Sequence, residues 1–92
     1  MMIKIERLVL QRFIGESVIV DRVRIVVTGM TSRSVTLEID GRIETYGDNR
    51  IVQVTPDCRV SFYQIRKTNR NGQYSWVVKL VFEAPRVLTV AI

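Results

Sequence analysis

The sequence predicts an all-β fold: a small antiparallel β-barrel or sandwich of about eight or nine short strands, with little or no helix. Three observations lead to this class. Apolar and polar residues alternate with a period of two through most of the chain, which is typical of half-buried strands. β-branched residues dominate these runs, and residues that favour turns separate them. No window shows the 3.6-residue apolar period of an amphipathic helix.

Five strands are expected in the first half of the chain. Gly15 separates the first two, residues 29–32 form a hairpin loop between the third and fourth, and Asp40-Gly41 suits a two-residue type I′ turn before the fifth. Because polar residues alternate with Val35, Leu37 and Ile39, these three should point inward. The predicted strands are residues 2–10, 17–20, 22–28, 33–39 and 42–46.

The second half repeats this style with four further strands. Asn71-Gly72 is its strongest hairpin signal, and Pro85 is expected to end the strand that precedes it. Within that strand Tyr74 and Trp76 alternate with polar residues, and both are expected to belong to the core. The predicted strands are residues 50–54, 59–67, 74–83 and 86–92.

Ninety-two residues are enough for one domain, which we expect to span residues 1–92. An internal repeat with copies at 8–46 and 47–92 is one interpretation of its organisation. Each half contains a short strand, a turn with an aspartate, a basic strand and a hairpin, and RVRIVV at 22–27 occupies the same place as RVSFYQ at 59–64.

The composition favours a binding protein for an acidic partner. The formal net charge is +5, and eleven of the fourteen basic residues are arginine, whose planar fork of donors fits phosphate and base edges. The chain has no histidine and a single cysteine, Cys58, so the sequence offers neither the commonest acid–base group nor a zinc ligand set. We therefore expect no enzymatic activity, no catalytic residue, no metal and no cofactor.

The compartment is expected to be the cytoplasm. No apolar run approaches the ~20 residues that cross a bilayer, and charge interrupts the first residues where a secretory signal would be apolar. A single cysteine, expected to be a small buried hydrophobe, fits a reducing environment.

The first third of the chain has a recognisable order of features: leucines in the first strand, Arg12, the Gly15-Glu16 turn, a short apolar strand, Asp21 and an alternating valine-rich strand. In this order, LVLQRFIGESVIVDRVRIVVTG (8–29) resembles the carbon storage regulator (CsrA/RsmA) family of bacterial translational regulators. The likeness continues through the following hairpin to Ile39, and Ala84-Pro85-Arg86 resembles the family's asparagine-alanine-proline motif.

The resemblance implies a shorter chain of five strands and a helix that forms intertwined dimers, in which the first and last strands of the two chains lie side by side and make an RNA-binding edge. Because this chain is longer, two explanations stay open. It is either two fused copies acting as a single-chain pseudo-dimer, or one copy with an insertion that forms a homodimer. The chain departs from the family at Phe13, where members carry a second arginine, and at about Ile92, where they carry an RNA-binding arginine.

We therefore predict an RNA-binding translational regulator that binds single-stranded or hairpin-loop mRNA. The alternatives are a module of the same fold that has lost RNA binding and contacts a protein partner, and a small barrel of the Sm or SH3 type. The predicted RNA-binding residues are Leu10, Arg12, Arg22, Arg24, Arg33, Arg66, Lys67, Arg70, Arg86 and Val90.

These candidates form three groups. Arg12 lies at the end of the first strand, where the resemblance implies an RNA contact. Arg22 and Arg24 are expected on the outward face of one strand, in a basic stripe with Arg33 in the next loop. Around 66–70 lies the densest basic cluster, close to Tyr74, and phosphate attraction combined with base stacking is a known way to bind single strands. Solvent-exposed charge on a half-buried sheet is the structural alternative for every group.

Overall fold

The computed structural model describes the backbone of residues 2–91 and the side chains of residues 7–84. Between residues 2 and 91 the chain forms eight strands and no helix, which confirms the all-β prediction. Accordingly, no helix in this range is able to cross a membrane. The strands are β1 (Met2–Phe13), β2 (Ser17–Val20), β3 (Val23–Thr31), β4 (Ser34–Ile39), β5 (Arg42–Gly47), β6 (Ile51–Thr55), β7 (Cys58–Arg70) and β8 (Gln73–Ala91).

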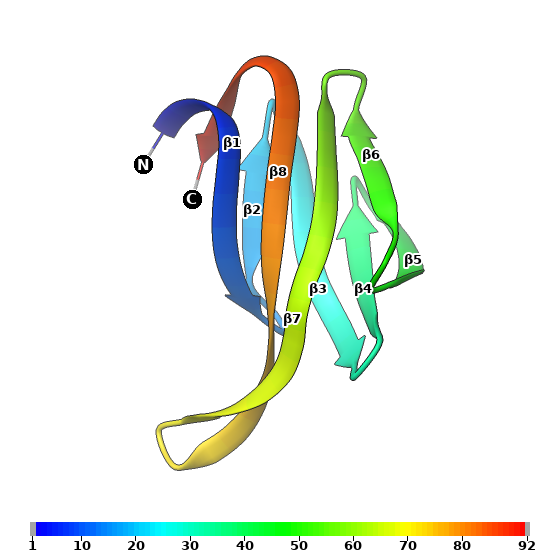
Figure 1. Cartoon of the computed structure of the whole chain (residues 1–92), viewed down its shortest axis with the longest axis vertical. Coiled ribbons are helices and arrows are strands. Elements are labelled where there is room, and N and C mark those ends of the chain that lie inside the picture. Colours follow the sequence, from blue (N-terminus) through cyan, green and yellow to red (C-terminus); the bar gives the residue numbers. More distant parts are fainter. Residues whose placement is uncertain (1, 92) are drawn as a thin grey trace.

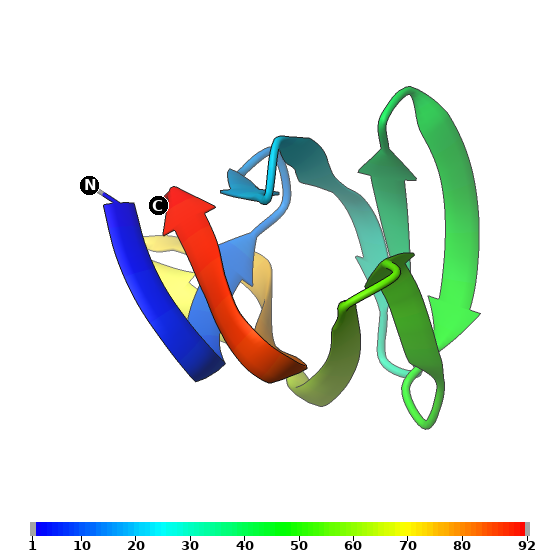
Figure 2. The same ribbon diagram turned by 90° about the horizontal axis from the view of Figure 1, so that it is seen from above.

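The strands form two four-stranded antiparallel sheets (Figures 1 and 2). The first is the meander β2-β3-β4-β5. The second has the order β6-β7-β8-β1, because the N-terminal strand adds to the free edge of β8. The end of β8 pairs with β2 through Ile19↔Ala91 and Val20↔Val90, and this joins the two sheets. Among the described strands β5 and β6 stand at the two ends of the hydrogen-bonded path, so the fold is the sandwich form of the prediction and not a closed barrel.

The two sheets share one plan. In each, a short strand leads through a two-residue turn into a longer strand, and a hairpin leads into the next one. The turn Asp21-Arg22 corresponds to Pro56-Asp57, so Ile25 of β3 corresponds in position to Val60 of β7. β1 then takes the place beside β8 that β5 takes beside β4.

β8 does not end at Pro85, contrary to the sequence-based prediction; it runs on to Ala91 and is nineteen residues long in all. The proline lies where the ladder with β1 is irregular, because Arg7 pairs with Glu83 while Ile5 pairs with Leu88. At this point β8 also leaves β7 and moves toward β2. A strand that changes sheets bends at such an irregularity, and a residue without an N–H is tolerated there. Two predicted short strands are therefore one long strand.

Two turn predictions also need correction. The β3–β4 turn lies at Ser32-Arg33, whereas Gly29 is inside β3 beside a register shift, a common place for a glycine in a strand. Arg22 is not on an outward strand face with Arg24. It lies in the β2–β3 turn, where its φ is +73°.

Apolar residues of both sheets fill the space between them. The alternation in β4 places Val35, Leu37 and Ile39 inward as predicted, and they meet Phe62 and Phe82 of the other sheet in one cluster. Cys58 is fully buried in the same cluster. Among the described side chains no polar or charged one is buried, so apolar contact stabilises this core.

Candidate nucleic-acid interface

The second sheet has a solvent-facing side that is rich in cations. Residues directly opposite each other in an antiparallel pair share a face, so the register places Arg7, Glu83 and Arg59 in one row across β1, β8 and β7. Beyond the row of Val81 and Ser61, this side has Lys79 beside Tyr63 and then Val77 beside Arg66. We call the surface made by Arg7, Arg59, Tyr63, Arg66 and Lys79 the basic sheet face. It carries four cations against the single carboxylate of Glu83.

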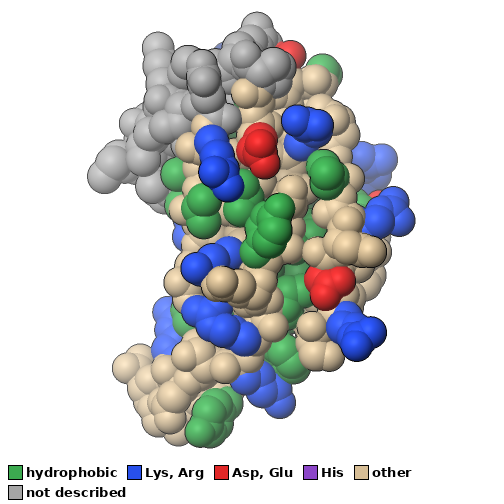
Figure 3. All heavy atoms as spheres, viewed as in Figure 1, with side chains coloured by type: hydrophobic (Ala, Val, Ile, Leu, Met, Phe, Trp, Pro, Cys, Tyr) green, Lys and Arg blue, Asp and Glu red, His purple; other side chains and the backbone are tan. Residues whose placement is uncertain are grey.

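Apolar side chains cross the middle of this face. Val9 is 50% exposed, Tyr63 53% and Ile51 61%. Figure 3 shows this side of the molecule, with Lys and Arg side chains above and below a central group of hydrophobic ones. Val77 and Val81 lie on the same side and are buried, yet they are not part of the cluster between the sheets. The face therefore has a small apolar layer of its own.

A shallow pocket of about 480 Å³ lies at the end of this face nearest the β6–β7 turn. Arg7 and Arg59 line it on either side of Glu83, together with Gln53 and a second acidic residue, Asp57. The Gln53 amide donates to the carbonyl oxygens of Thr55 and Cys58, at 2.6 and 3.3 Å, which fixes the side chain against the turn. Two guanidinium groups can hold phosphate oxygens through charge-assisted hydrogen bonds, but two carboxylates line the same pocket, so its formal charges balance.

At the other end of the face, β7 and β8 continue beyond the body as a two-stranded arm, residues 66–77 (Figure 1). The arm carries Arg66, Lys67 and Arg70, the cluster identified from the sequence. Lys67 faces Trp76 across the two strands, with its Nζ 5.1 Å from the ring centroid. Tyr74, which was expected in the core, is 76% exposed because the arm extends past the end of the apolar interior.

Arg70 is fixed to the body of the protein. Its guanidinium lies over the Phe13 ring, 4.1 Å from the centroid, and its Nη2 is 3.8 Å from Oε2 of Glu16. Glu16 in turn accepts the backbone N–H of Phe13 at 2.8 Å, so its carboxylate closes the β1–β2 turn. These contacts tie the arm to the β1–β2 turn and neutralise part of the Arg70 charge.

Arg12 is turned away from the basic sheet face. It is paired with Val78, whose side is the inner side of the sheet, and it is half-buried. Its Nε donates to the carbonyl oxygen of Ser17 at 3.3 Å and its Nη1 to that of Gln11 at 2.8 Å. The guanidinium therefore closes the β1–β2 turn, which is a structural role.

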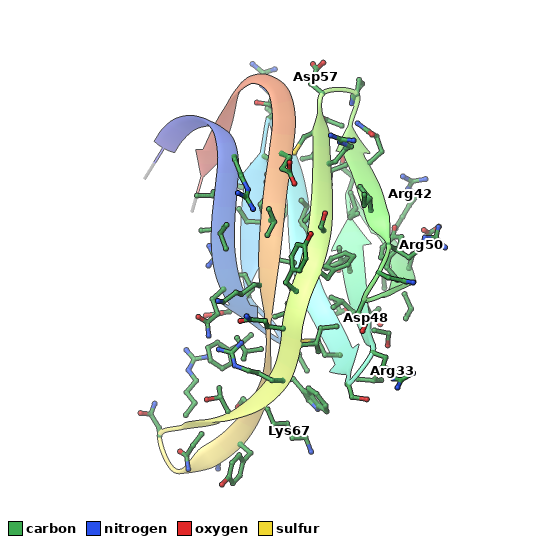
Figure 4. All side chains as sticks on the ribbon, in the orientation of Figure 1. Arg33, Arg42, Asp48, Arg50, Asp57 and Lys67 are labelled. Atoms are coloured by element: carbon green, nitrogen blue, oxygen red, sulfur yellow. The ribbon has the colours of Figure 1, made fainter. Side chains whose placement is uncertain are left out.

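The remaining candidates are dispersed. Arg22, Arg24 and Arg33 belong to the first sheet, and Arg33 is labelled in Figure 4 at the β3–β4 turn. Leu10 is half-buried and packs against the core. The side chains of Arg86 and Val90 lie outside those that the structure describes. Of the predicted residues, Arg66, Lys67 and Arg70 share the arm, where Arg66 and Arg70 lie on one side of the ribbon and Lys67 on the other.

Sequence reasoning missed Arg7, Arg59, Tyr63 and Lys79. The alternation in β7 already places Arg59, Ser61 and Tyr63 on one side, and Lys79 stands between the apolar residues Val78 and Leu80 of its strand. The resemblance implies that the first and last strands lie together, but no expectation paired the first strand with residues 77–83 of β8, and this pairing adds Arg7 to the surface. Long-range strand pairing leaves no local signal.

Comparison of the chain with protein-family models, with curated proteins and with solved structures gave no match. The likeness to carbon storage regulators therefore stays a hypothesis that rests on the residues quoted for it.

Two described groups with shifted pKa values lie away from the basic sheet face. Burial raises the pKa of the Cys58 thiol to about 11, and the nearby charge of Asp21 adds to this. Burial and a 2.8 Å hydrogen bond to Glu44 raise the pKa of Tyr46, whose ring stacks on Phe62. Both groups stay protonated and neutral at pH 7, as expected for structural groups.

Proposed function

We propose that this protein binds single-stranded RNA across the basic sheet face. The observation that carries the proposal is an exposed tyrosine at the centre of a sheet, with cations around it. Tyr63 lies on β7 directly beside Lys79, with Arg66 in the next row toward the arm. Arg59 lies in the opposite direction along β7, two rows from Tyr63 and beyond Ser61. Phosphate attraction from the cations combined with an aromatic ring for stacking is a sequence-tolerant way to hold a single strand.

The charge balance gives the expected salt dependence. If Arg7, Arg59, Arg66 and Lys79 each neutralise one phosphate, the slope of log K against log salt is about −3, from about −0.7 per contact on a single strand. Affinity should then fall roughly 50-fold to 70-fold between 50 and 200 mM salt. Fluorescence anisotropy with a labelled oligonucleotide at several salt concentrations measures this slope.

Matched variants locate the interface. Arg59→Ala should weaken binding and reduce the magnitude of the slope by about 0.7. Arg24→Ala removes another exposed arginine, this one from the first sheet, and it should leave the RNA affinity and the salt slope unchanged. Tyr63→Ala should lose about 1–3 kcal/mol of binding free energy, and Tyr63→Phe should retain it. Equal losses for Arg24→Ala and Arg59→Ala would mean that RNA responds to net charge only.

A regulatory role on mRNA is the physiological form of this proposal. Its test is a hairpin with a GGA-containing loop, the element that the resembled family reads, compared with the same stem and a scrambled loop. Preference for the first loop supports a translational regulator. Equal binding limits the proposal to sequence-independent RNA binding.

The exposed apolar side chains Val9 and Ile51 favour a second candidate, a protein-interaction module. Binding that depends on these two residues should be nearly insensitive to salt. A chain that binds no RNA at 50 mM salt would favour this candidate.

A further inference from the structure

The arm has a second side that the basic sheet face does not include. Because directly opposite residues share a face, Lys67 and Trp76 lie on this side together, followed by Asn69 and Tyr74. We call these four residues the aromatic arm face. Tyr74 is 76% exposed, and Trp76 is half-buried under the Lys67 ammonium group.

The opposite side of the arm is already occupied. Arg70 faces that side and packs on Phe13 while it pairs with Glu16, so the arm is anchored to the body. This anchor leaves the aromatic arm face open and holds it at a fixed place relative to the basic sheet face. Figure 4 shows Lys67 on the arm, beyond the end of the body.

The charge of the arm selects the kind of ligand. Residues 66–77 contain three cations and no carboxylate. Arg66 lies on the side of the arm that continues the basic sheet face, and its neighbour Lys67 lies on the aromatic arm face, so both sides of the arm carry a cation where it leaves the body. An anionic chain bound on the sheet would be drawn along the arm, and aromatic rings on an anion-attracting surface fit a ligand that carries both phosphates and flat bases.

We infer that the aromatic arm face stacks two unpaired bases of the same RNA strand, an inference that rests on the proposed function. Tyr74 and Trp76 are two residues apart on one strand, which separates their Cα atoms by about 7 Å. This is about twice the ~3.4 Å rise of successive stacked bases. The bases that meet these rings are therefore splayed, as in loops and single strands, and a duplex cannot present them. Lys67 moves from the Trp76 ring to a phosphate when a base takes its place.

The experiment uses Trp76, the single tryptophan of the chain, as its own probe. The intact protein is titrated with a twelve-residue oligouridylate, with the same strand annealed to its complement, and with inorganic polyphosphate. Tryptophan emission is recorded, and anisotropy of a labelled oligouridylate reports binding in parallel. The single strand should quench the emission, and the duplex and polyphosphate should not.

Tyr74→Leu keeps an apolar side chain and removes the ring. It should weaken oligouridylate binding about 5- to 150-fold with an unchanged salt slope, because the lost contact is not ionic. Tyr74→Phe is the matched control and should bind like the parent. Since Tyr74 is 76% exposed, the leucine variant should fold, and its thermal midpoint checks this.

The outcomes separate this inference from the proposed function. Binding by anisotropy without quenching, and without an effect of Tyr74→Leu, would overturn the inference and leave the basic sheet face as the site. Quenching by polyphosphate equal to that by RNA would overturn it too, because Trp76 would then report only the displacement of Lys67 by an anion. If the protein binds no RNA at all, both the proposed function and this inference are refuted.

Discussion

Replacing Arg22 with glycine should stabilise the fold. Three two-residue turns among the described residues have a positive φ at both central residues: Asp21-Arg22, Asp40-Gly41 and Asn71-Gly72. The φ values at the second position are +73°, +84° and +82°. In two turns that position is glycine, which adopts this conformation without strain, and in the first it is a long side chain.

The expected magnitude follows from two opposing terms. A non-glycine residue held in the left-handed region costs about 1–3 kcal/mol. Glycine itself lowers the free energy of unfolding by about 0.4–1 kcal/mol, because it increases the conformational entropy of the unfolded chain. Arg22→Gly should therefore raise the free energy of unfolding by about 1 kcal/mol, which for a domain of this size raises the thermal midpoint by about 4–8 °C.

Two variants separate backbone strain from the guanidinium group. Arg22→Ala keeps a Cβ at φ +73° and should leave stability within about 0.5 kcal/mol of the parent. Gly41→Ala should destabilise by about 1 kcal/mol, because a Cβ there meets no atom within 4 Å and only the dihedral angle opposes it.

The assay is thermal and urea unfolding followed by circular dichroism. A midpoint for Arg22→Gly at or below that of the parent, or an equal rise for Arg22→Ala, would refute the strain argument. RNA affinity should be the same in the parent and in Arg22→Gly, since the turn lies outside the basic sheet face.

Three further predictions concern the core, the arm anchor and assembly. Because burial raises the pKa of Cys58 from 9.0 to about 11, the unfolded thiol ionises first, so this thiol should lower stability by about 1.4 kcal/mol between pH 7 and pH 10; urea unfolding at both pH values should show a loss about that much larger in the parent than in Cys58→Ala, in which Tyr46 still titrates. Glu16→Ala should lower the free energy of unfolding by about 1–2 kcal/mol, because the Phe13 N–H loses its acceptor. Glu16→Gln keeps an acceptor and should lower it by less than half as much. Equal losses in the two variants would mean that the carboxylate acts through its charge on Arg70. If the chain is a single-chain pseudo-dimer, light scattering should give a molar mass of 10.6 kDa, and twice that value would favour the homodimer with an insertion.

The sequence predicted the fold well wherever the information was local. Alternation located the inward residues of β4, and Asp40-Gly41 and Asn71-Gly72 adopt the positive φ values that their turn type requires. Pro85 was misjudged because a proline breaks a regular ladder, whereas here it lies at a bend between two sheets. Nothing local distinguishes these two situations.

The candidate site was predictable only in part for a related reason. A cluster of cations in adjacent positions, such as Arg66, Lys67 and Arg70, is visible in the sequence. Which side of the ribbon each one faces depends on the bulge at Gln64 and Ile65, where β7 has one residue more than β8. Tyr74 was predicted to be buried from its alternation with Trp76 and Val78, and alternation gives the shared face correctly but not where the core ends.

The pairing of β1 with β8 also sets the order in which this chain can fold. Leu8 lies opposite Phe82, 74 positions further along, whereas every neighbour in the β2–β5 meander is the next strand in sequence. Closing so long a loop lowers the entropy of the chain before any contact between β1 and β8 can stabilise it. Folding therefore slows as the sequence separation of contacting residues grows. During synthesis the first meander can form while β1 still has no partner, and the basic sheet face exists only after β8 has arrived. A circular permutant that joins residue 2 to residue 91, which are already paired, and opens in the β5–β6 turn would make both meanders contiguous, and it should fold faster than the natural order.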